Sequence, residues 1–138
     1  MVKVTDEIRD VFHALIEEAE KQVKLNPTAG QVVVVKTAKG NTYTCVNNNT
    51  YTIENGVIMS VGDFDEEIEF IQMLVDIDDV EVKYIVCMWQ SGSVEIPSYH
   101  FRNGILEICS KNQEAIWVGQ GEDCLLLRAL KDTVPAKE

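Results

Sequence analysis

The segment from Gln31 to Thr37 reads QVVVVKT, and it constrains the fold of this chain more than any other segment. Runs of β-branched residues favour strands, and a strand that is apolar at successive positions is covered on both faces. The turn residues AKGN and a second run, TYTCV from Thr42 to Val46, follow at once, which predicts a β-hairpin. The sheet that contains this hairpin therefore needs covering layers on both sides.

Amphipathic helices are predicted on either side of the hairpin. From Thr5 to Lys24, apolar residues recur every three or four positions, and Thr5 can cap the helix. Asp65 to Val75 has the same spacing and carries three acidic residues in its first turn, as the positive end of a helix dipole favours. The segment from Glu54 to Ser60 fits a helix less well because Gly56 interrupts it, but we expect a short helix there.

The second half of the chain alternates between strands and helices. We expect strands at Val82 to Trp89 and Ala115 to Val118, and helices at Arg102 to Ser110 and Leu125 to Leu130. An initial hairpin followed by such alternation predicts an α/β fold with three layers, in which a mixed central sheet of about five strands has helices on both faces. All 138 residues are expected to form one domain, residues 1–138.

Composition excludes several classes of function. The net charge of −11 disfavours binding to duplex nucleic acid or to anionic membranes, because polyanions are bound mainly through basic side chains. No apolar run is long enough to span a bilayer, and the charged N-terminal segment does not resemble a signal peptide, so we expect a cytoplasmic protein. The four cysteines are widely spaced in apolar surroundings, which predicts buried thiols and no disulfide framework.

Several segments resemble the cytidine deaminases when they are taken in order. VVVVKTAKGNTYTCVN is similar to the first hairpin of that family, which ends in an asparagine. TIENGVI, from Thr52 to Ile58, can be laid on the family's CAERxAI stretch, and IPSYHFRNGILE, from Ile96 to Glu107, on its SPCGxCRQxLxE stretch. EAIWVGQGED and LLLRALKDTVP resemble its last strand and terminal helix. The resemblance implies the three-layer cytidine deaminase-like fold over nearly the whole chain.

The resemblance also implies where a catalytic metal site would stand. Zinc deaminases use three thiolate or imidazole ligands and a glutamate that moves protons between the metal-bound water and the base. The three ligand positions of this chain hold Thr52, Ser98 and Phe101, so we expect no metal ligands and no cofactor, with zinc present only if the alignment is wrong. Glu54 falls at the proton-shuttle position and is the candidate catalytic residue, although an acid at a helix start is also explained by the helix dipole.

Four further residues are candidates for ligand binding. In the family an asparagine and a glutamate of an NxE stretch hold the ribose, and here Asn47 and Asn49 occupy those positions. The stretch NNN is equally compatible with a turn. Tyr99 could line a nucleoside-like pocket, and His100 lies between two lost ligand positions, where it is either an isolated ligand or an ordinary pocket histidine.

Two classes of function follow from the resemblance. The first is a catalytically silent protein that acts as a binding or regulatory subunit and keeps a weakened nucleoside-like pocket. The second is an oligomerisation scaffold, because the family implies a homo-oligomer, a dimer or a tetramer. An active deaminase with unrecognised ligands is the alternative. The chain has no phosphate-binding glycine loop, no GxSxG and no HExxH, so a different enzyme chemistry has little support.

Overall fold

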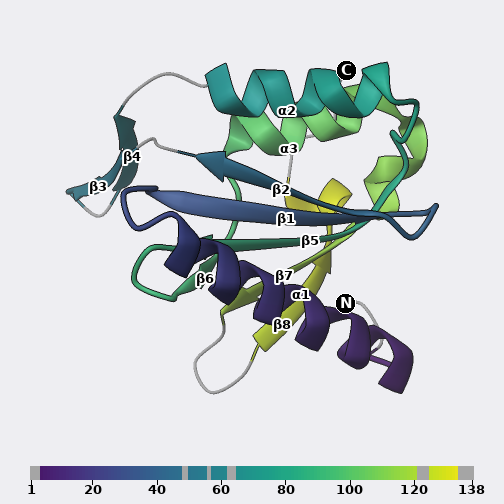
Figure 1. Ribbon diagram of the computed structural model, residues 1–138, viewed down its shortest axis with the longest axis horizontal. Helices are drawn as coiled ribbons and strands as arrows, with labels where there is room; N and C mark the ends of the chain where they lie inside the picture. Colours follow the sequence, from purple (N-terminus) through teal and green to yellow (C-terminus); the bar gives the residue numbers. More distant parts are fainter. Residues whose placement is uncertain (1–3, 48–49, 56, 62–64, 121–124, 134–138) are drawn as a thin grey trace.

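A computed structural model describes residues 4–47, 50–55, 57–61, 65–120 and 125–133. Within these ranges the main sheet has six strands in the order β2-β1-β5-β7-β8, and β6 pairs with β5. Helix α1 covers one face, and helices α2 and α3 cover the other (Figure 1). The expected α/β fold with a mixed sheet and helices on both faces is therefore confirmed.

The first three elements form where the sequence predicts them. Helix α1 spans Asp6–Leu25, and the Thr5 hydroxyl caps it by accepting a hydrogen bond of 3.2 Å from the Ile8 amide. Strands β1 (Gln31–Thr37) and β2 (Thr42–Asn47) form the antiparallel hairpin. The four successive valines of β1 are fully buried because α1 lies on one side of the strand and α2 and α3 on the other.

The prediction of a helix at residues 54–60 is wrong. Strands β3 (Thr50–Glu54) and β4 (Val57–Val61) form a separate two-stranded sheet there. The residues of both strands are mostly β-branched or aromatic, and the dipeptide Asn55-Gly56 between them is a strong hairpin signal. Asn55 adopts the left-handed φ of 52° that such a turn requires. The hairpin projects beyond the end of β2 (Figure 1).

Helix α2 (Asp65–Asp76) and strand β5 (Val82–Trp89) form as expected, and the short β6 (Val94–Glu95) pairs with β5. Helix α3 (Tyr99–Ile108) begins three residues earlier than predicted, because Ser98 caps it by accepting from the Phe101 amide at 3.1 Å. A 3₁₀ turn at Ser110–Glu114 then leads to strand β7 (Ile116–Gln120), which is parallel to β5.

The prediction of a closing helix at residues 125–130 is also wrong. Strand β8 (Leu125–Ala129) occupies this segment and pairs antiparallel with β7, and a 3₁₀ turn follows at Leu130–Thr133. A short run of leucines fits a buried strand and a buried helix equally well. The strand forms here because it can pair with the edge of β7. None of the helices in the described ranges is both long enough and apolar enough to span a bilayer.

Candidate functional site

A buried carboxylate lies where β2, α2 and the start of α3 meet. Glu67 is in the first turn of α2, and only 1% of its surface is exposed. The Asn47 amide, at the end of β2, donates a hydrogen bond of 2.6 Å to Glu67 Oε1. A charged side chain is rarely buried without partners, so the neighbours of this carboxylate decide what it can do.

The start of α3 supplies the other partners of Glu67. The Ser98 hydroxyl lies 2.9 Å from Oε2 and 3.1 Å from Oε1, and it donates to this carboxylate. His100 Nδ1 lies 3.3 Å from Oε2. Ser98 also accepts the Phe101 amide as the helix cap, so one hydroxyl joins the cap of α3 to the carboxylate of α2. We call Asn47, Glu67, Ser98 and His100 the Glu67 cluster.

The cluster changes the electrostatics around it. Burial raises the pKa of Glu67, and hydrogen bonds from Ser98, His100 and Asn47 offset part of that rise. Burial, together with the negative charges of Glu67 and Glu66, raises the pKa of the Cys45 thiol to about 12. Burial also raises the pKa of Cys87 well above its ordinary value, and Glu67 adds to the effect. Both thiols are therefore protonated and unreactive at neutral pH.

Two of the three described cysteines are buried, as the sequence predicts. Cys45 and Cys87 are buried free thiols, and Cys109 is a half-buried one. The Cys87 thiol donates to Gln31 Oε1 at 2.6 Å, and the Cys45 thiol donates to the Glu66 carbonyl at 3.7 Å. Cys124 lies outside the described residues.

The described residues of the Glu67 cluster do not supply the donor set of a tetrahedral zinc site. Such a site needs three thiolate or imidazole donors, or a carboxylate in place of one of them. Phe101 has no donor atom and is fully buried, and the Ser98 hydroxyl donates to Glu67. Among the described residues, no group of three or more histidine, cysteine, aspartate or glutamate side chains is placed to hold a metal ion.

The structure brings together two of the residues that sequence reasoning selected. Asn47 and His100 both contact Glu67, from β2 and α3 respectively. Asn47 belongs to a strand and is fully buried, and Asn49 lies outside the described residues. Tyr99 is 54% exposed, and the Arg102 guanidinium lies 5.8 Å from the centre of its ring. Tyr99 therefore faces solvent at the start of α3.

Sequence reasoning missed the residue at the centre of the cluster. Glu54, the candidate for the proton-shuttle position, ends strand β3. Its side chain lies outside the described part of the chain, so this candidate stays a prediction. Thr52 is in the same strand. Glu67 was predicted only as one of three acids that favour a helix start. Its position near the start of the helix that precedes β5 was the available signal.

Three solved structures are similar to this one over most of their length. The cytidine deaminase from Mycobacterium leprae matches with a TM-score of 0.60 and 15% identity, over 91% of this chain and 98% of that one. The enzyme from Burkholderia pseudomallei matches with a TM-score of 0.58 and 15% identity, over 89% and 95%. The enzyme from Mycobacterium tuberculosis matches with a TM-score of 0.57 and 16% identity, over 90% and 94%.

The sequence comparisons add nothing to this likeness. No protein-family model and no curated protein matches the chain. At such low identity the structural likeness shows the fold alone, which is the cytidine deaminase-like fold that the sequence resemblance implies.

Proposed function

We propose that this chain, which has the cytidine deaminase-like fold, is a catalytically silent binding or regulatory protein that keeps a weakened nucleoside-like pocket at the Glu67 cluster. The observation that carries the proposal is the pairing of Glu67. Its oxygens accept hydrogen bonds from Asn47 and Ser98, and His100 lies against Oε2. A carboxylate engaged in this way has little capacity left to move protons for a substrate.

The position of Glu67 supports a link between this cluster and the deaminase site. The resemblance puts the family's glutamate on a helix that is followed by a strand and then by a helix opening with PCxxC. In this chain α2 carries Glu67, β5 follows, and α3 begins after Pro97 and Ser98. With Glu67 in the glutamate position, the three ligand positions hold Asp65, Ser98 and Phe101. This set still lacks the thiolates or imidazoles that zinc prefers.

The exposed side of the cluster is suited to weak binding of a planar ligand. His100 keeps 41% of its side chain exposed beside Glu67, and Tyr99 next to it presents an aromatic ring to solvent. An aromatic ring can stack on a nucleobase, and an imidazole can hydrogen-bond to its edge. Asn47 is fully buried, and its amide already donates to Glu67. In this arrangement the Asn47 side chain does not reach a ribose.

The test combines metal content, activity and binding. Protein purified without an affinity metal should contain far less than one zinc per chain and should release no ammonia from cytidine. Calorimetric titration with cytidine should show weak saturable binding that Tyr99→Ala and His100→Ala both reduce, whereas Lys24→Ala, a change on the exposed end of α1, should leave it unaltered.

Two outcomes would overturn this proposal. Stoichiometric zinc with ammonia release would establish an active deaminase, and Glu67→Gln and Glu54→Gln would show which glutamate serves it. If the metal-free protein bound no nucleoside at millimolar concentrations, the pocket would have to be abandoned.

A homo-oligomer is a second proposal, supported by the outer face of α2. Ile68 and Val75 are seven residues apart on this helix, and they are 52% and 44% exposed. Residues at this spacing lie on one side of a helix, where contact with a second copy of the chain would remove both from water. A dimer or tetramer in solution would bury them, and sedimentation velocity measures this directly.

A further inference from the structure

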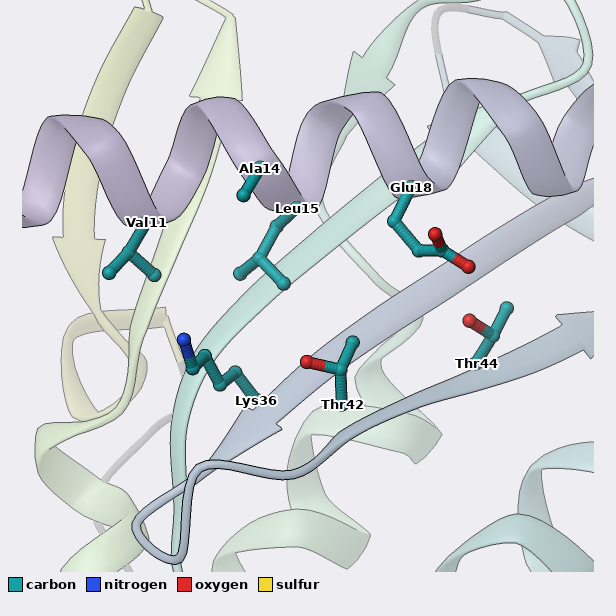
Figure 2. A pocket seen from close by; sticks show the side chains of 7 residues that line it. All are labelled: Val11, Ala14, Leu15, Glu18, Lys36, Thr42 and Thr44. Carbon is teal, nitrogen blue, oxygen red and sulfur yellow. The ribbon is translucent and has the colours of Figure 1, made fainter.

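A groove of about 350 Å³ lies on the face of the sheet opposite to the Glu67 cluster (Figure 2). One wall is helix α1, which contributes Val11, Ala14, Leu15 and Glu18. These positions are three, four and seven residues apart, so they form one stripe along the helix. The other wall is the β1–β2 hairpin.

The groove exists because α1 leaves the edge of the sheet uncovered. Alternate residues of β1 face α1, and Val32 and Val34 are fully buried beneath it. The next residue on this face is Lys36, which pairs across the hairpin with Thr42. Strand β2 is the last strand on its side of the sheet. Polar residues therefore replace the valines where the helix no longer covers the sheet.

The groove carries one charge of each sign. Lys36 is half-buried, and in the ranges that the structure describes no carboxylate lies within 4.0 Å of its ammonium group. Glu18 lines the same groove, and its Oε1 accepts a hydrogen bond of 2.8 Å from the Gln22 amide. Figure 2 shows Lys36 toward the Val11 end and Glu18 toward the Thr44 end.

The separation of the charges defines the shape of a ligand. A helix rises about 1.5 Å per residue, so Val11 and Glu18 lie about 10 Å apart along α1. Between the two ends, Ala14 and Leu15 supply an apolar wall, and Thr42 and Thr44 supply hydroxyls. A single short α-amino acid, whose two charges are adjacent, cannot reach both ends.

We propose that this groove binds a small zwitterion whose amino and carboxylate groups are separated by an aliphatic chain of several carbons. The ligand's carboxylate would pair with Lys36, and its ammonium group would pair with Glu18. Its methylene groups would lie against Ala14 and Leu15. Each charged group would gain a partner of opposite sign in a partly desolvated place, where such pairs are stronger than on an open surface.

Aminocaproate is a direct probe of this proposal, with caproate and hexylamine as ligands that carry one charge each. We expect calorimetric titration of the full chain to show saturable binding of aminocaproate and at least about tenfold weaker binding of both single-charge ligands, as the loss of one charged hydrogen bond predicts. In amide NMR spectra, aminocaproate should shift the signals of Val11, Ala14 and Thr42.

Two variants and a matched control test the named residues. Lys36→Met keeps the aliphatic stem, and Glu18→Gln keeps a partner for Gln22, so both should fold while weakening aminocaproate binding about tenfold. Lys21→Met removes an exposed charge elsewhere on α1 and should leave binding unchanged. The proposal is overturned if aminocaproate does not bind at millimolar concentrations, if caproate binds equally well, or if Lys36→Met has no effect.

Discussion

Asn47 and Glu67 are joined by a hydrogen bond of 2.6 Å between the end of strand β2 and the first turn of helix α2. Both residues are almost fully buried, and their contact lies on the side of the sheet that α2 and α3 cover. The bond fixes the start of α2 against the edge of the sheet, and Ser98 fixes the start of α3 to the same carboxylate. One acidic side chain therefore connects three elements.

The ionisation of Glu67 should make stability fall as the pH rises. Burial raises its pKa in the folded protein, so folding favours the protonated carboxyl. The contribution of the protonated Glu67 to the free energy of unfolding is fully present below about pH 4.3, the pKa of a glutamate in the unfolded chain. It is lost as the pH rises through the higher pKa that Glu67 has in the folded protein. Glu67→Gln cannot ionise, so urea unfolding at a series of pH values should show the wild-type protein losing stability relative to this variant as the pH increases. A constant difference between the two proteins would contradict this.

Asp79 should show the opposite dependence on pH. Burial alone raises its pKa, but hydrogen bonds from Asn41 at 3.0 Å and from the Tyr43 hydroxyl at 2.8 Å contribute to a net lowering. The contribution of the ionised Asp79 to the free energy of unfolding is therefore fully present above about pH 3.9, the pKa of an aspartate in the unfolded chain. It is lost as the pH falls through the lower pKa that Asp79 has in the folded protein. Asp79→Asn should remove this acid-dependent part of the unfolding free energy. Equal acid sensitivity of the two proteins would show that Asp79 does not contribute.

Ser98 should matter more than an ordinary helix cap. Ser98→Ala removes the cap of α3 and the hydroxyl that donates to Glu67, so we expect a loss of about 2 kcal/mol or more in the free energy of unfolding. Thr5→Ala removes a cap that is exposed and has no such second role, and it should cost about 1 kcal/mol. Ser98→Thr keeps the hydroxyl and should restore most of the loss. If Ser98→Ala lowered the free energy of unfolding no more than Thr5→Ala does, the hydrogen bond from Ser98 to Glu67 would contribute nothing to stability.

The central part of the fold could be predicted because its elements carry their own signals. The valines of β1, the stripe of α1 and the acidic start of α2 each have one consistent interpretation. The two errors, at residues 54–60 and 125–130, concern short apolar segments for which periodicity does not separate a helix from a strand. In the first, the Asn55-Gly56 dipeptide was the stronger signal.

The Glu67 cluster was harder to predict than the fold. Its other members are 20 to 33 residues from Glu67 in the chain, and they meet it only because β2, α2 and α3 converge. Glu67 also stands beside two other acids, Asp65 and Glu66, but it alone lies three and seven residues before the buried Phe70 and Leu74, on the same face of α2. This spacing was the signal for its burial, whereas its partners on β2 and α3 are set by tertiary packing.

The ring of Trp117 occupies the space in which a side chain at position 119 would lie, so strand β7 needs a glycine there. A Cβ atom at Gly119 would overlap the indole of Trp117, which is itself buried. Gly119→Ala should therefore displace the ring and destabilise the protein by about 1–3 kcal/mol. In a Trp89→Phe background, the fluorescence of Trp117 should change together with the stability. Gly104→Ala is the control, because its Cβ would meet only the mobile end of Ile71, and it should cost less.

Association through α2 would give its exposed apolar residues a physical role. Ile68 and Val75 lie on one side of this helix, and glutamate at either position would place a charge in an interface that excludes water. Sedimentation velocity should show a dimer or tetramer for the wild-type chain and a shift toward monomer for Ile68→Glu and Val75→Glu. Leu25→Glu is the matched control, because Leu25 is 64% exposed at the end of α1, on the other side of the sheet. A wild-type chain that stays monomeric at all concentrations, or a Leu25→Glu variant that dissociates equally, would remove α2 as the association surface.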